Sequence, residues 1–187
     1  MTDTSTIPST IPTTIPSTIP STIPSTGAPY VLGRDEGIRT HFLNNLATTK
    51  VTGADSGSLS VVEFLAPRGF GPPLHEHRDE DEIVIVLEGE VAFRSGDVES
   101  VGAAGATAFL PHGVAHTFQV LSDEARMISV TSSITGAAPN FDEMVAALGQ
   151  PTESTEIPAP MDIDPGQVAR ACDAHGITVL GPPPAMI

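Results

Sequence analysis

The chain has 187 residues and a formal net charge of −15, with 8 lysines and arginines against 23 aspartates and glutamates. Such a surface repels phosphate backbones and anionic lipid, so we expect neither nucleic acid nor a membrane as a partner. One cysteine permits no intramolecular disulfide, and without a long apolar run or a signal-like N-terminus we expect a cytoplasmic protein.

The chain begins with a four-residue repeat. Residues 4–26, TSTIPSTIPTTIPSTIPSTIPST, contain five Ile-Pro pairs. A proline at every fourth residue removes backbone donors and prevents a helix, while threonine and serine solvate the rest. We therefore expect a disordered tail over residues 1–28, either dispensable for chemistry or used as a docking arm. One domain is expected over residues 29–187.

Short apolar runs separated by glycine-containing turns follow the tail. They occupy residues 30–32, 58–65, 82–89, 91–94, 106–111, 116–120 and 126–133. Many short strands at close spacing predict an all-β antiparallel sandwich or barrel.

The C-terminal part predicts two helices and a last strand. Residues 141–148 place their apolar side chains on one face, between a capping Asn140 and a terminating Gly149. A second helix is expected to begin at Asp164-Pro165 and to end near Gly176, and residues 177–181 predict a strand. We expect this extension, from about residue 140, to cover the barrel.

Two histidines lie directly before the apolar strand that begins at Glu82. His75 and His77, at i and i+2 of an extended segment, point the same way with Cα atoms roughly 7 Å apart. Glu82 shares a strand face with Val84 and Val86, where a carboxylate needs a positive partner. A metal ion held by His75, His77 and Glu82 would be that partner.

A second cluster adds a third imidazole. In GATAFLPHGVAHTFQV, residues 105–120, a Pro-His-Gly turn precedes His116 on a strand. Three imidazoles and a carboxylate suit a divalent transition metal with open positions for water, O2 or substrate. The other acids of the first cluster are expected to form a solvated loop, in which one orients a ligand histidine; they are Glu76, Asp79, Glu80 and Asp81.

The spacing of both clusters resembles the two sequence motifs of cupins. The matching residues are Gly69, His75, His77, Glu82 and Gly89 in the first motif, and Gly105, Pro111, Gly113 and His116 in the second. The departure is Val120, where the second motif usually ends in asparagine. The resemblance implies a double-stranded β-helix, or jelly-roll, barrel with one divalent metal bound by His75, His77, Glu82 and His116. The metal would be Ni, Co, Mn or Fe, or else Cu or Zn.

The overall layout resembles small bacterial quercetinase-like cupins. This resemblance implies a metal-dependent dioxygenase that cleaves a flavonol or similar enolisable aromatic substrate with O2, with Glu82 as metal ligand and proton acceptor. The predicted substrate pocket consists of Val84, Val86, Phe118 and Val120, with Phe70, Phe93, Phe109 and Met127 as further neighbours. Two alternatives stay open: an O2-independent isomerase, cyclase or lyase acting on a small metabolite, and a non-catalytic ligand-binding or sensing cupin.

The opposite face of the strand that carries Glu82 is also apolar. It presents Ile83, Ile85 and Leu87, which must be covered. We expect a homodimer through this face, with coverage by the C-terminal helices as the alternative.

Overall fold

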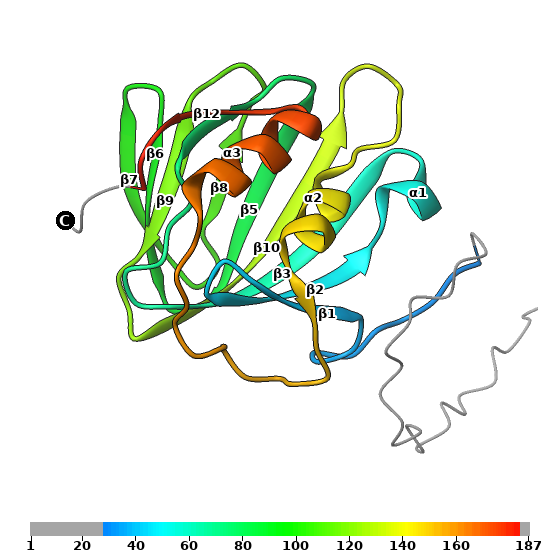
Figure 1. The fold of residues 1–187 in the computed structure, drawn as a ribbon, viewed down its shortest axis with the longest axis horizontal. Coiled ribbons are helices and arrows are strands. Elements are labelled where there is room, and N and C mark those ends of the chain that lie inside the picture. Colours follow the sequence, from blue (N-terminus) through cyan, green and yellow to red (C-terminus); the bar gives the residue numbers. More distant parts are fainter. Residues whose placement is uncertain (1–27, 184–187) are drawn as a thin grey trace, which may run out of the picture.

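The structure, a computed structural model, describes residues 28–183 (Figure 1). The predicted tail over residues 1–28 lies, apart from Ala28, outside this range, as do residues 184–187. The described part is built mainly from two antiparallel sheets with three helices, so the all-β cupin barrel is confirmed. The division into a tail and one domain over residues 29–187 stays a prediction.

Seven strands form the larger sheet and five form the smaller one. In spatial order, the larger sheet contains β11 (Gln150–Pro151), β1 (Ile38–Phe42), β2 (Asn45–Val51), β3 (Leu59–Pro67), β10 (Glu124–Ser133), β5 (Glu80–Glu88) and β8 (Thr107–Leu110). The smaller sheet contains β12 (Ile177–Gly181), β4 (Leu74–His77), β9 (His116–Val120), β6 (Glu90–Ser95) and β7 (Val98–Ala103).

Alternation along β5 decides which side chains face the barrel interior. Glu80, Glu82, Val84 and Val86 are buried, whereas the residues between them are half-buried or exposed. Because successive side chains of a strand point to opposite faces, two carboxylates share the interior with two valines. The outer face is not fully covered within this chain, since Ile83 is 37% exposed.

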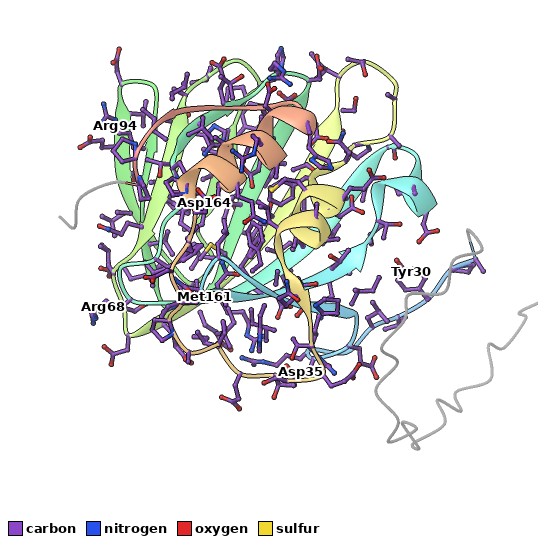
Figure 2. The ribbon with its side chains drawn as sticks, viewed as in Figure 1. Tyr30, Asp35, Arg68, Arg94, Met161 and Asp164 are labelled. Carbon is purple, nitrogen blue, oxygen red and sulfur yellow. The ribbon has the colours of Figure 1, made fainter. Side chains whose placement is uncertain are left out.

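The C-terminal helices lie side by side across the barrel (Figure 1). Helix α2 (Phe141–Leu148) packs on β1 and β3, and α3 (Pro165–Ala174) packs on β12 and on α2. Asp164 caps α3 by accepting a hydrogen bond from the Gly166 N–H at 2.8 Å, and Figure 2 labels it where the helix begins. Both predicted helices and the last strand are therefore confirmed, and the outer face of β5 is left uncovered.

Several elements differ from the prediction because the barrel interior is partly polar. Strand β2 was not predicted, since its buried positions include Asn45, Thr48 and Thr49 and show no apolar alternation. The short helix α1 (Gly53–Ser56) and strands β1, β4 and β7 also lie outside the predicted runs. The strand predicted at residues 30–32 is wrong: this segment is irregular, and the Tyr30 hydroxyl donates to the Lys50 carbonyl at 2.8 Å.

Within residues 28–183, none of the helices has the length and apolar character needed to cross a membrane. The cytoplasmic location stays a prediction.

The turn between β5 and β6 requires glycine at position 89. Gly89 has φ of +86°, and a Cβ there would lie 2.5 Å from the Glu124 carbonyl oxygen. We predict that Gly89→Ala lowers the free energy of unfolding, measured in urea, by more than roughly 1–2 kcal/mol. That amount is the cost of placing an alanine in the left-handed backbone conformation without any clash. Gly105→Ala is the control, because φ is +91° there but no atom lies within 4 Å. Equal losses in the two variants would contradict the steric argument.

Candidate metal centre

Four side chains from three strands meet inside the barrel. Strand β4 supplies His75 and His77, β9 supplies His116, and β5 supplies Glu82. One potential ligand atom of each residue lies within 4.8 Å of those of the others. The structure thus brings the four predicted ligands together across the two sheets, with the imidazoles on one sheet and the carboxylate on the other.

Strand register places two of the imidazoles against each other. His75 pairs directly with His116 across antiparallel β4 and β9, which puts both side chains on the same face. Their ring centroids are 4.3 Å apart. His77 follows two residues later on the same face, with its ring 5.3 Å from each of the other two.

Backbone carbonyls set the orientation of two of the rings. The Nδ1 atom of His75 lies 2.8 Å from the Pro73 carbonyl oxygen, and that of His116 lies 2.9 Å from the Val114 carbonyl oxygen. A carbonyl oxygen only accepts, so Nδ1 must be the donor in both rings. In the neutral rings Nε2 then carries the lone pair, as metal binding requires.

The Glu82 carboxylate is fixed at both oxygens. Its Oε1 accepts a hydrogen bond from the Ser129 hydroxyl at 2.5 Å, and its Oε2 lies 3.3 Å from His116 Nε2. Burial raises the pKa of Glu82, but the hydrogen bond from His116 and the charges of His77 and His116 outweigh it and hold the pKa at about 2. The carboxylate is therefore ionised at neutral pH.

The net pKa shifts of two of the imidazoles have opposite directions. Burial lowers the pKa of His75, and repulsion from His116 and His77 lowers it further, to about 3. Burial also lowers the pKa of His116, but the hydrogen bond to Glu82 outweighs this, so that the pKa is raised. His75 is thus neutral at neutral pH, which is the form that binds a metal.

The donor set fits a divalent transition metal. Three imidazole nitrogens and one carboxylate oxygen converge in a buried place, and among the described residues neither ring nitrogen of His77 has a hydrogen-bond partner. Buried polar atoms are rarely left unpaired in proteins. A cation at the centre of the cluster would pair with His77 Nε2 and with the Glu82 carboxylate together.

An apolar cavity of about 70 Å³ adjoins the cluster and opens toward a wider groove of about 740 Å³. His75, Glu82 and Ser129 are among the residues that line the cavity. The rest of the lining is mainly apolar and comes from β1, β3, β5, β9, β10, β12 and both C-terminal helices. The two hollows share Leu43, Phe70, Pro72, Pro73, Val168 and Val179, so they lie next to each other.

The predicted pocket residues divide between this cavity and other places. Those that line the cavity are Val84, Phe70, Phe118 and Met127. Val86 and Val120 are buried in the core without lining it, and Phe93 packs on Phe118 with ring centroids 6.2 Å apart. The prediction is wrong for Phe109, which is 60% exposed because it shares the outer face of the sheet with its register partner Ile83.

The helices supply pocket residues that the sequence analysis missed. Phe141 and Met144 of α2 and Val168 and Cys172 of α3 line the cavity. The signal was present in the apolar face of each helix, but that face indicates burial and not the surface against which it packs. Ser129 was missed as well, although it shares strand parity with Met127.

The acidic residues around the histidines do not behave alike. Asp81 is partly exposed and accepts from the backbone N–H of the exposed His112 at 2.9 Å. Glu80 is only 7% exposed, so the predicted solvated loop is wrong for this residue. The burial of Glu80 was not predicted because the strand was expected to begin at Glu82, whereas β5 begins two residues earlier.

Ser129 is expected to stabilise the ionised form of Glu82. The pKa of this carboxyl falls from 4.5 to about 2 on folding, so its contribution is present above pH 4.5 and is lost as the pH falls through the folded-state pKa. In protein stripped of metal, we predict that Ser129→Ala costs about 1–3 kcal/mol of unfolding free energy at neutral pH. The cost should shrink only at about pH 2, near the folded-state pKa of Glu82, because the variant's carboxyl protonates at a higher pH than that of the unmodified protein.

Urea unfolding at the two pH values measures this difference. Ser132→Ala, on the same strand but exposed, is the control and should change stability by less than about 0.5 kcal/mol. A cost for Ser129→Ala that does not depend on pH would show that the hydroxyl does not act on the carboxylate charge.

Comparison with known proteins gives a consistent result. The cupin domain family matches residues 61–131. Quercetin 2,3-dioxygenase of Bacillus subtilis (strain 168) is 28% identical over 131 residues, which are 70% of this chain and 37% of that protein. The chain thus spans little more than a third of the length of this curated relative.

The fold is similar to that of a solved structure. A predicted oxalate decarboxylase from Thermotoga maritima superposes with a TM-score of 0.50 and 17% identity, over 56% of this chain and 100% of that one. KdgF from Halomonas sp. gives a TM-score of 0.45 and 19% identity, over 48% of this chain and 79% of that one. Residues 61–131 thus match the cupin domain family, in agreement with the two-sheet barrel and the motif spacing, and the sequence is similar to that of a quercetin 2,3-dioxygenase.

Proposed function

We propose that the protein is a metal-dependent dioxygenase that cleaves a flavonol or a similar enolisable aromatic substrate with O2. The observation that carries this proposal is the apolar cavity that opens onto His75 and Glu82 of the candidate metal centre. The similarity to a quercetin dioxygenase supports the same reaction class.

In this proposal His75, His77, Glu82 and His116 hold one divalent ion, which would be Ni, Co, Mn or Fe, or else Cu or Zn. The bound ion would act as a Lewis acid toward the substrate enolate. The chain's own contribution is a site from which apolar walls exclude water, so that the charges inside interact more strongly.

The walls favour a flat aromatic substrate. Five phenylalanines line the cavity; they are Phe42, Phe64, Phe70, Phe118 and Phe141. In the described part of the chain, no lysine or arginine is among the lining residues, which disfavours phosphorylated substrates. An uncharged ring system with an acidic hydroxyl group suits this lining.

Glu82 is the proposed acceptor of the substrate's hydroxyl proton. A carboxylate with a pKa near 2 is a weak base, and its Oε1 is already occupied by the Ser129 hydroxyl. Proton transfer to Glu82 therefore requires a hydroxyl group whose anion is delocalised over an aromatic system. This requirement also favours an enolisable aromatic substrate.

O2 consumption with quercetin tests the proposal. We expect uptake by protein reconstituted with one or more first-row divalent metals, because the cavity adjoins the ligand cluster. His75→Ala, reconstituted in the same way, should lose the uptake, since it removes one donor and its lone pair. Metal content is measured on every sample.

Lack of uptake by fully loaded protein with any of these metals would refute flavonol oxygenation. Turnover without O2 would then identify an isomerase, cyclase or lyase. Saturable binding without turnover would identify a binding or sensing cupin.

We further propose that two copies associate through the outer face of the larger sheet. Phe109 on β8 and Ile83 on β5 are register partners and form an exposed apolar pair. Arg34 and Glu88 form an ion pair with an N–O separation of 2.6 Å at the C-terminal end of β5. Both charges are exposed there and could pair with charges of a second copy. The C-terminal helices pack elsewhere and do not cover this face.

A charge at position 109 should separate the copies. We predict that Phe109→Asp converts a dimer into a monomer in size-exclusion chromatography with light scattering, because it places two carboxylates in an apolar contact. Val98→Asp on β7, at an exposed position of the smaller sheet, is the control and should stay dimeric. A monomeric unmodified protein at all concentrations would exclude this interface.

A further inference from the structure

His77 differs from the other two candidate ligand histidines in how it is held. His75 and His116 each donate Nδ1–H to a carbonyl two residues earlier in the chain. His77 is 1% exposed, and within residues 28–183 neither of its ring nitrogens has a hydrogen-bond partner. Since Nε2 faces Glu82 at 3.9 Å, Nδ1 is the atom that needs an acceptor.

A buried carboxylate faces this nitrogen. Glu80 Oε2 lies 3.8 Å from His77 Nδ1. Glu80 and Glu82 both point inward from β5, so one carboxylate approaches each nitrogen of the same ring. A ligand histidine commonly donates its second N–H to a carboxylate, which orients the ring and strengthens its metal-binding nitrogen.

The other oxygen of Glu80 is fixed by α2. Glu80 Oε1 accepts a hydrogen bond at 2.7 Å from the backbone N–H of Asn140, the N-cap residue of the helix. The N–H groups at a helix start favour a negative charge. The carboxylate is therefore anchored on one side and leaves Oε2 directed at His77.

The gap of 3.8 Å is too long for a direct hydrogen bond but can be bridged. A cavity of about 110 Å³ lies beside it, with His77, Glu80, Asn140 and His175 among its lining residues. A water molecule needs only about 10–15 Å³ of such volume and two or more polar partners. The cavity supplies both.

We propose that Glu80 is a positioning residue of the metal centre. It accepts the Nδ1 proton of His77 through one water molecule in this cavity, and so aims Nε2 at the metal. This inference rests on the proposed metal centre and adds to it a residue outside the four ligands.

Glu80→Gln separates this role from the capping of α2. The glutamine carbonyl still accepts from the Asn140 N–H. Its NH2 group then faces His77 Nδ1–H. Two hydrogen-bond donors therefore face each other, whereas the carboxylate of Glu80 offers an acceptor. We expect the affinity for Zn²⁺, measured by competition with a chelator, to fall by about 10–100-fold.

Glu76→Gln is the matched control. It makes the same change of charge one residue from both β4 histidines, but Glu76 points to the opposite face of the strand. Its Zn²⁺ affinity should stay within about twofold of the unmodified protein, compared with the 10–100-fold effect expected at position 80.

Proton NMR of Co²⁺-loaded protein gives a second readout. Each ligand histidine contributes one exchangeable, paramagnetically shifted Nδ1–H signal. Glu80→Gln should shift or broaden the His77 signal and leave those of His75 and His116 unchanged. If Glu80→Gln does not fold, Glu80→Asp, whose carboxylate is too short to reach, should show the same change.

The outcomes separate the two proposals. Zn²⁺ affinity that is equal in Glu80→Gln and Glu76→Gln, with all three signals unmoved, would overturn the role of Glu80 while leaving the metal centre intact. Unmodified protein that binds Zn²⁺ no better than His75→Ala would instead overturn the metal centre itself.

Discussion

The ionised carboxylate of Glu82, buried against three imidazoles, is the interaction on which the rest of the barrel depends. An unpaired charge in an apolar interior is costly, so the surrounding groups act to compensate it. Ser129 donates to one oxygen, and His116 lies beside the other. Because the histidines and Glu82 come from different sheets, this charge also holds the two inner faces of the barrel in one relative position.

Strand parity and motif spacing explain how much of the site was predictable. A period of two placed His75 and His77 on one face, and the second cluster placed His116 on the adjacent strand, where register pairs it with His75. Phe109 was placed in the pocket without regard to this rule: on β8, Leu110 points inward and Phe109 outward. Glu80 was expected in a solvated loop because the start of β5 was predicted two residues too late.

Other features could not be predicted because they depend on contacts between distant parts of the chain. Strand β2 has a polar interior face, and its threonines are buried only because neighbouring strands cover them. The cavity walls combine β1 near the start of the described chain with α2 and α3 near its end. Each helix showed an apolar face in the sequence, but the surface that it covers is set by the fold as a whole.

Helix α2 belongs to both the cavity and the metal centre. Phe141 lines the cavity and packs against the His77 ring with centroids 5.8 Å apart, and the N–H of Asn140 holds Glu80. His75 and His116 are fixed instead by carbonyls of their own chain segments. Helix α2 therefore faces His77 through both Phe141 and the carboxylate that Asn140 holds, whereas the other two imidazoles have anchors in their own segments. The ligand that lacks a backbone anchor is the one coupled to the pocket wall.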